Sequence, residues 1–145
     1  MRDGRAPVPL NEDTSRVMRA NKAKDTLPEI SLRKAIWKRG IRGYRLHWKN
    51  VPGRPDIAFP VKKIAVFVNG CFWHRCPYCR PQLPKSHKAF WRRKFANNVR
   101  RDRAKARLLR RAGWRVLTVW ECQLQRDLPR WASRVKGLVS GPEGQ

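Results

Sequence analysis

The sequence predicts an α/β domain in which a mixed β-sheet is flanked by helices. Residues 64–68 form a nearly continuous apolar, β-branched run, as expected of a central strand buried on both faces. Residues 115–120 form a second strand-like run, and a long helical stretch over 86–112 separates the two. A helix and two short strands are predicted before the central strand, and one helix after residue 120. The order helix, three strands, helix, strand, helix is typical of a sheet with helical layers.

The first helix is predicted to begin after Thr26. Thr26 and Glu29 have the spacing of a capping box, and Pro28 falls in the first turn, where proline is tolerated. Gly40 is a natural end for this helix. The apolar side chains that fall mostly along one face are Ile30, Leu32, Ala35 and Ile36.

Three strands and a loop are expected next. Alternating side chains over 44–48 predict the first strand, and residues 56–59 predict the second, which Pro60 ends. Gly70 ends the central strand, and residues 71–84 are expected to form an irregular loop.

Two more helices complete the predicted order. Ser86 is the expected N-cap of the long basic helix. The asparagines at 97 and 98 are a potential break that would divide this helix in two. The last helix is expected over 128–139.

The chain is strongly basic. Its 145 residues include 35 lysines and arginines against 10 acidic residues, so the formal net charge is +25. That imbalance opposes compaction unless a polyanion binds, and nucleic acid is the usual one. An apolar content of 41%, with seven tryptophans and five phenylalanines, argues against a disordered chain. Charge alone leaves open an enzyme or a basic structural protein, such as a ribosomal or chromatin component.

The length suits one domain. We expect a folded domain over 25–140, a flexible basic arm over 1–24 and a flexible tail over 141–145. No apolar run reaches the about 18 residues of a membrane span, and the N-terminus lacks the apolar core of a signal peptide, so a cytoplasmic location is expected. In that compartment the four cysteines favour metal ligation over disulfides.

The cysteine spacing predicts a structural zinc site. Four residues separate Cys71 from Cys76, and two separate Cys76 from Cys79. Cys122 follows just past the last strand, with 42 residues between it and Cys79. Three thiolates from a loop and one from a distant segment suit tetrahedral zinc, and a site closed by four protein ligands is structural. The alternatives are four unrelated buried thiols, or His74 in place of one cysteine.

An acidic residue at the start of the second strand is a candidate magnesium ligand. Asp56 ends the turn-like run Pro-Gly-Arg-Pro-Asp, one strand before the buried strand. Metal-dependent nucleases use an acid at such a place, because a divalent cation there polarises the scissile phosphate. A simple turn is the alternative interpretation.

The end of the central strand supplies further candidates. The acid and lysine that many metal-dependent nucleases of the PD-(D/E)xK type carry here are absent, since the chain reads Phe-Val-Asn at 67–69. His74 is the candidate general base, because histidine side chains change charge near neutral pH. A surface or supporting position is the alternative for His74, and we assign no role to His47 or His87.

Large aromatic side chains surround these candidates. Phe72 and Trp73 lie in the polar loop, and Trp91 lies on the following helix. Such rings can wedge between base pairs or can pack beneath the loop, and the residues alone do not separate the two.

Five short blocks, taken together, indicate a family. They are PGRPD (52–56), GCFWH (70–74), NVRRD (98–102), GWRVL (113–117) and VWEC (119–122). In this order, over roughly residues 15–140, the chain resembles the very-short-patch-repair (Vsr) endonucleases. The resemblance implies a degenerate PD-(D/E)xK core and a Mg²⁺-dependent, monomeric bacterial enzyme that associates with the nucleoid when it acts. Family members nick double-stranded DNA 5′ to the thymine of a T·G mismatch, which arises when 5-methylcytosine deaminates.

The resemblance also implies roles for individual residues. Asp56 and the backbone carbonyl of Val68 resemble the Mg²⁺ ligands, and His74 resembles the histidine that positions or activates water. Glu29 resembles an acid on the first helix that holds water near the metal, and Asp102 is expected to orient His74.

Phe72, Trp73 and Trp91 resemble the aromatics that intercalate beside the mismatch. Two positions depart from the best-known members. Asn69 stands where they have a histidine, and an amide cannot act as a base at neutral pH. Cys76 and Cys79 stand where they have a histidine and a cysteine, which replaces a Cys₃His site by Cys₄.

Three hypotheses therefore remain. The first is a T·G mismatch endonuclease, with mismatch-repair proteins as candidate partners. The second is a restriction-linked or mobile-element nuclease with the same core and another DNA target. The third is a basic DNA-binding module with a zinc staple and no enzymatic activity.

Overall fold

The computed structural model describes residues 25–141. The arm predicted over 1–24 and residues 142–145 of the predicted tail lie outside this range. The elements in chain order are α2 (Leu27–Lys38), β1 (Arg45–Leu46), β2 (Ile57–Phe59), β3 (Ile64–Asn69), α3 (Cys71–His74), α4 (Lys88–Arg111), β4 (Arg115–Trp120) and α5 (Glu121–Ser140). Within residues 25–141, no helix is long and apolar enough to cross a membrane.

The four strands form one mixed sheet in the order β1-β2-β3-β4. The pairs β1–β2 and β2–β3 are antiparallel, while β3 and β4 run parallel and are connected through α4. Ile57 pairs with Val66, and Val68 pairs with Val119. The predicted mixed sheet flanked by helices is thereby confirmed.

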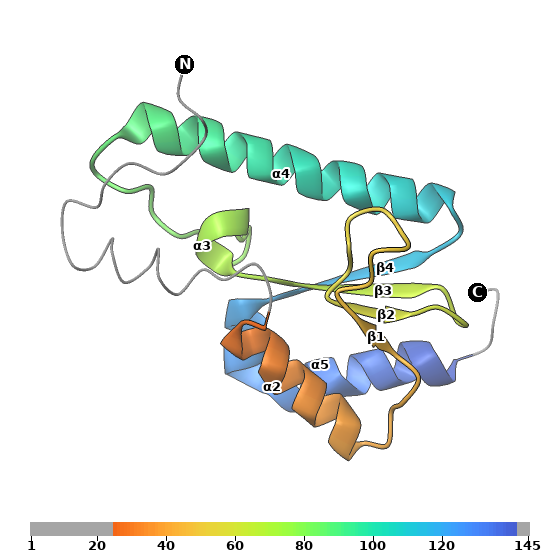
Figure 1. The fold of residues 1–145 in the computed structure, drawn as a ribbon. Coiled ribbons are helices and arrows are strands. Elements are labelled where there is room, and N and C mark those ends of the chain that lie inside the picture. The colour runs from red at the N-terminus through yellow and green to blue at the C-terminus, as the bar shows by residue number, and fades with distance from the viewer. Residues whose placement is uncertain (1–24, 142–145) are drawn as a thin grey trace.

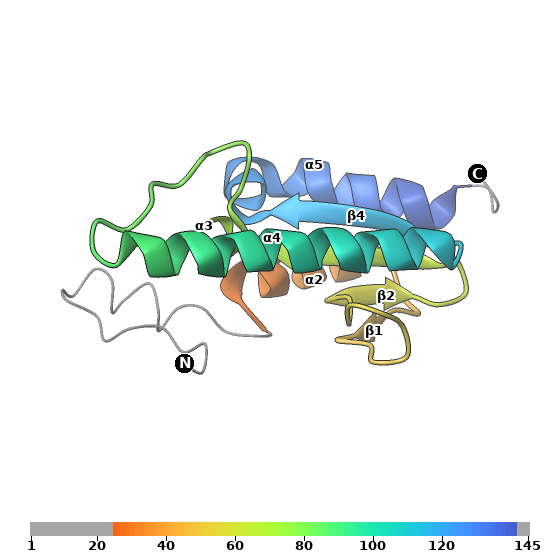
Figure 2. The same cartoon turned by 90° about the horizontal axis from the view of Figure 1, so that it is seen from above.

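Helices cover both faces of the sheet (Figure 1). Helices α2 and α5 lie against one face, and α4 crosses the other, as the view from above also shows (Figure 2). The larger core cluster joins α2 and α5 to the sheet, and its fully buried members include Leu32, Ile36, Ile64, Val66, Val119 and Val135. Beneath α4, a smaller cluster holds Ala58, Ala65, Leu109 and Trp114. Because β3 contributes to both clusters, its run is apolar throughout and does not alternate.

The long helix differs from the sequence prediction at its start and in its middle. Helix α4 is continuous through the asparagines at 97 and 98, so the expected break is wrong. Its N-cap is His87, not Ser86, and His87 has a left-handed conformation with no side-chain capping bond. The buried rings of Trp91 and Phe95 explain the continuity, because they pack the first half of the helix against the rest of the protein.

The last helix begins seven residues before the predicted start at 128, directly after β4. Asp127 and Pro129 lie inside this helix. Asp127 is non-helical (φ −155°, ψ 72°), and its carboxylate accepts a hydrogen bond from the Arg130 N–H at 3.2 Å. This residue therefore caps a second helical segment after a kink, while the first segment begins at Glu121. The loop predicted over 71–84 also contains one helical turn, α3.

Candidate functional site

A cavity of about 460 Å³ opens where the first turn of α2, the ends of β2 and β3, and the middle of α4 meet. The predicted catalytic and magnesium-binding residues line it, and so do two of the three predicted intercalating aromatics: Glu29, Asp56, Val68, Asn69, Phe72, Trp73, His74 and Asp102. They come from several elements, and so the packing of the layers brings together residues that are distant in the sequence. Gly53, Arg54, Lys105 and Glu121 also line the cavity, although we assigned them no role from the sequence.

Asp56 lies just before β2 and is anchored by the neighbouring strand. Its Oδ2 accepts a hydrogen bond from the Val68 N–H at 2.7 Å, which leaves Oδ1 for other partners. Burial raises the pKa of Asp56 to about 6, the Val68 N–H opposes that rise, and the nearby Glu29 carboxylate adds to it. Burial disfavours the charged form of the Asp56 carboxylate, and a cation bound beside it would offset that cost. The donor set of Asp56 and a backbone carbonyl of Val68 suits Mg²⁺, which prefers oxygen ligands.

Glu29 lies at the cavity because α2 begins there, with Thr26 as its N-cap. The Thr26 Oγ1 accepts from the Glu29 N–H at 3.3 Å, as the capping-box pattern predicted. Glu29 Oε1 accepts from the N–H of Asp25, the residue before the N-cap, at 3.2 Å. Glu29 is 1% exposed, and burial raises its pKa. Among residues 25–141, its Oε2 is the buried side-chain oxygen without a hydrogen-bond partner, although it forms an ion pair with Arg33 at 3.6 Å.

His47 adjoins this site through Glu29 and Asp56, although we assigned it no role from the sequence. Its Nε2 lies 3.2 Å from Asp25 Oδ1, with hydrogen-bonding geometry, and 3.1 Å from Glu29 Oε2. Its Nδ1 lies 4.0 Å from Asp56 Oδ1. The hydrogen bond from His47 lowers the pKa of Asp25. No sequence signal marks His47, because its place follows from its N–H bonding to the Asp56 carbonyl at 3.1 Å across the β1–β2 pair.

His74 and Asp102 form the second polar unit of the cavity. His74 Nδ1 lies 2.6 Å from Asp102 Oδ2, so α3 and α4 are tied together at this point. Asn98 strengthens the link, since its side-chain amide donates to the Trp73 carbonyl at 3.0 Å. The structure thus brings together the histidine and the acid that was expected to orient it. A proton on Nδ1 facing the carboxylate would leave Nε2 as an acceptor.

Two further polar residues border the cavity at the end of the sheet. Asn69, the last residue of β3, is buried there. Glu121 begins α5, and its Oε1 accepts from the Cys71 N–H at 3.3 Å. An acid in the first turn also stabilises the N-terminus of a helix. Glu121 therefore links the cavity to the neighbouring cysteines.

The aromatic residues form one cluster with unequal exposure. Phe72 and Trp73 are partly exposed at the cavity, with ring centroids 5.1 Å apart. Trp91 is 2% exposed and stacks on Phe95 at 5.4 Å. The Arg75 guanidinium lies 4.3 Å from the Phe95 ring centroid. Trp91 thus supports the two outer rings from beneath, and its predicted intercalation would require the cluster to open.

The four cysteines meet in space. Their sulfur atoms all lie within 4.8 Å of one another, none forms a disulfide, and the Cys76 and Cys122 sulfurs are 3.7 Å apart. Tetrahedral zinc with bonds of about 2.3 Å separates its sulfur ligands by about 3.8 Å, so the arrangement fits this ion. The Cys122 N–H also donates to the Cys71 sulfur at 3.3 Å. His74 does not belong to the cluster, since its ring faces Asp102.

Comparison with known proteins identifies relatives of this chain. The sequence profile described as DNA mismatch endonuclease Vsr matches residues 9–80. The type II nicking enzyme V.NaeI of Lentzea aerocolonigenes is 44% identical over 129 residues, covering 86% of this chain and 76% of that protein. V.XorIIP of Xanthomonas oryzae pv. oryzae, also named a type II nicking enzyme, is 40% identical over 123 residues, covering 85% and 89%.

The chain belongs to the Vsr family. The DNA mismatch endonuclease Vsr of Escherichia coli is 37% identical over 111 residues, covering 77% of this chain and 70% of that protein. The Vsr profile match spans Asp56 and His74 but ends before Asp102 and Cys122. An alignment that covers 86% of the chain necessarily includes both of these later residues. The resemblance inferred from the five sequence blocks is thereby confirmed.

Proposed function

We propose that the protein is a Mg²⁺-dependent DNA endonuclease that nicks one strand 5′ to the thymine of a T·G mismatch. The observation that carries this proposal is one cavity that holds the Asp56 and Glu29 carboxylates, the His74–Asp102 pair and the partly exposed Phe72 and Trp73 rings. Membership of the Vsr family and relatives named as nicking enzymes support it. A nuclease core of the PD-(D/E)xK kind is part of the same proposal.

Asp56 and the backbone carbonyl of Val68 would hold the magnesium ion. When bound, Mg²⁺ would polarise the scissile phosphate and lower the pKa of the attacking water. The acidic side of the cavity fits such an ion, because burial already raises the pKa values of both Asp56 and Glu29. Glu29 would accept a hydrogen bond from water and orient it, using the oxygen that has no hydrogen-bond partner.

His74 would serve as the general base. Asp102 holds its Nδ1 at 2.6 Å, which aims Nε2 toward the cavity and would stabilise the imidazolium once a proton has been taken. The water would attack phosphorus, the phosphodiester bond would break, and the leaving oxygen would take up a proton. Asn69 would contribute a hydrogen bond to water or phosphate but no proton transfer.

The exposed rings would select the substrate. Phe72 and Trp73 stand beside the cavity and are supported from beneath by Trp91 and Phe95. Inserting a ring between base pairs costs a few kcal/mol of stacking, and a mismatched step costs least. The wedge would therefore enter T·G steps more easily than paired ones.

One comparison favours a second candidate function. Several relatives are named type II nicking enzymes, among them V.NaeI and V.XorIIP. This naming is compatible with a restriction-linked nuclease of the same core that acts on another DNA target. The non-enzymatic module is disfavoured, because DNA binding and a zinc staple alone do not call for a half-buried Asp56 beside the buried Glu29.

A strand-specific nicking assay tests the proposal. End-labelled duplexes carrying one T·G mismatch in varied contexts, and fully paired controls, are incubated with the zinc-loaded protein and Mg²⁺. We expect a single nick 5′ to the thymine in mismatched duplexes alone. Cutting of paired duplexes would favour the second candidate, and binding without cutting in any divalent metal would favour the third hypothesis.

A further inference from the structure

Helix α4 has a second flank that the proposed cleavage site does not use. Its cavity-facing flank carries Asp102 and Lys105. The other flank borders a groove of about 770 Å³ between α4 and the edge strand β4. Four arginines of α4 line this groove: Arg103, Arg107, Arg110 and Arg111. Their spacing of i, i+4, i+7 and i+8 places them on one face of the helix.

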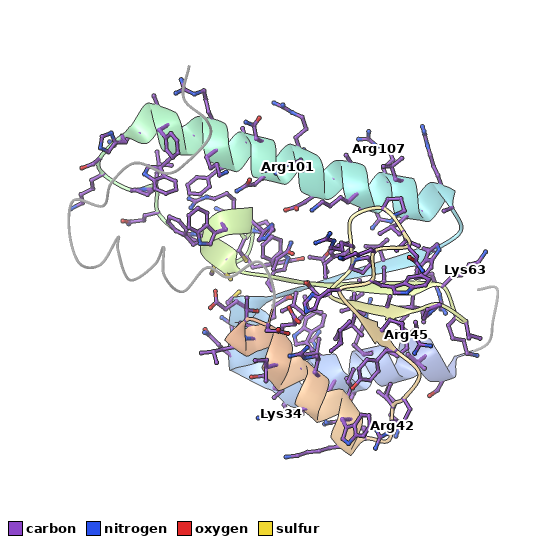
Figure 3. The ribbon with its side chains drawn as sticks, viewed as in Figure 1. Lys34, Arg42, Arg45, Lys63, Arg101 and Arg107 are labelled. Carbon is purple, nitrogen blue, oxygen red and sulfur yellow. The ribbon has the colours of Figure 1, made fainter. Side chains whose placement is uncertain are left out.

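The arginines of this groove lack counter-charges in the part of the chain that the structure describes. None of the four forms an ion pair within residues 25–141, where the ion pairs all involve Arg33, His47 or His74. The acid that lines the groove is Asp102, which is paired with His74. All four are exposed, and Figure 3 shows Arg107 projecting from α4. A row of like charges without partners is held at an energetic cost that a bound polyanion would relieve.

The groove adjoins the cleavage cavity. Asn69, His74 and Asp102 line both, so the His74–Asp102 pair lies at the border between them. The floor of the groove is formed by small or apolar side chains, Val99 and Ala106 of α4 and Trp120 of β4. A chain of phosphates that leaves the cavity past His74 would therefore run along the arginines.

We propose that this groove binds the phosphodiester backbone of DNA a few nucleotides away from the cleaved bond. This inference rests on the proposed function, since it takes the bound polyanion to be the DNA at the cleavage site. Arg111 lies eight positions after Arg103, or about 12 Å along the helix at about 1.5 Å per residue. One strand of duplex DNA presents a phosphate every 3.4 Å or so along its axis, so the row matches about three to four phosphates.

The test compares two variants that lose the same charge. In the first, Arg103, Arg107 and Arg110 are changed to Gln, which keeps a comparable helix propensity. In the control, the exposed Arg126, Arg134 and Lys136 of α5, across the sheet from α4, are changed to Gln. Binding of a fully paired fluorescent duplex by the zinc-loaded proteins is measured by anisotropy over a range of salt concentrations, without magnesium.

We expect the groove variant to bind at least tenfold more weakly near 0.1 M salt, and the slope of log K against log salt to fall by about 3, at about 0.9 per phosphate contact. The control should keep the wild-type slope within about one contact. Equal losses in the two variants, or an unchanged slope in the groove variant, would overturn the proposal. Because the duplex is paired and uncut, this binding experiment does not depend on T·G nicking. If the wild-type protein nicks no mismatched duplex, the proposed function is refuted, but the comparison of the two variants remains valid.

Discussion

Replacement of Asp56 by Asn should stabilise the magnesium-free protein at neutral pH. Burial raises the pKa of Asp56 from an ordinary 3.8 to about 6, so the folded state holds this proton more tightly than the unfolded state. The stability that the protonated Asp56 carboxyl contributes is fully present below pH 3.8 and is lost as pH rises through about 6. A difference of about 2 pKa units corresponds to about 3 kcal/mol. Asn removes the charge and can still accept the hydrogen bond of the Val68 N–H.

Urea unfolding of both proteins at several pH values measures this effect. The zinc-loaded proteins are compared without magnesium, and taking their difference at each pH cancels the titration of groups that do not interact with Asp56. We expect Asp56→Asn to exceed the wild type by about 3 kcal/mol at pH 8 and by about half of that at pH 5. Magnesium should stabilise the wild type at pH 8 and not the variant. An advantage that is the same at pH 5 and pH 8 would refute the electrostatic reasoning.

The remaining predictions concern activity and zinc. Trp73→Ala should lower the ratio of mismatched to paired nicking by about tenfold or more, because the inserted ring discriminates through an unstacking cost of a few kcal/mol that is lowest at a mismatch. The exposed Trp37→Ala is the control, and an equal loss on both duplexes would indicate a packing role. Asp102→Asn should lower kcat about 100-fold with little change in KM, because orientation of the general base acts on the chemical step; a change confined to KM would contradict this. His47→Ala should lower kcat about tenfold, because Asp25 and Glu29 lose the ring that lies between them. His47→Gln should restore part of the lost kcat, and His87→Ala is the control. A wild-type kcat in the His47→Ala variant would exclude His47 from the site. Cys122→Ser should release zinc, detected with a chromogenic chelator, and lower Tm by about 10 °C or more. A variant that keeps its zinc and the wild-type Tm would exclude a structural zinc site that includes Cys122.

Much of the scaffold was predictable from local patterns. The apolar run over 64–68 predicted a strand buried on both faces, and β3 contributes to both core clusters. The Thr26 and Glu29 spacing predicted the start of α2. The four cysteines, although Cys122 is distant, were predicted to converge, and their sulfurs lie within 4.8 Å of one another. These signals work because strand burial, helix capping and metal ligation each require particular residue types at fixed spacings.

Other features were not predictable from local patterns. The predicted start of the last helix at 128 falls just after the kink at Asp127, so only the second helical segment of α5 was predicted. The asparagines at 97 and 98 weaken a helix locally, but the buried Trp91 and Phe95 rings outweigh that preference in α4. In α4 the tertiary packing therefore overrode a local preference.

The sequence by itself determined which elements form and which chemical groups are available, because those depend on residue type and short-range spacing. The tertiary structure alone decided which groups meet. The β1–β2 pairing placed His47 between Asp25 and Glu29, and packing placed Trp91 beneath the outer rings. The packing of α4 across the sheet also left four of its arginines facing a groove instead of the cleavage cavity. Contacts of this kind depend on strand register and on how helices lie across a sheet, and both are set by the whole core together.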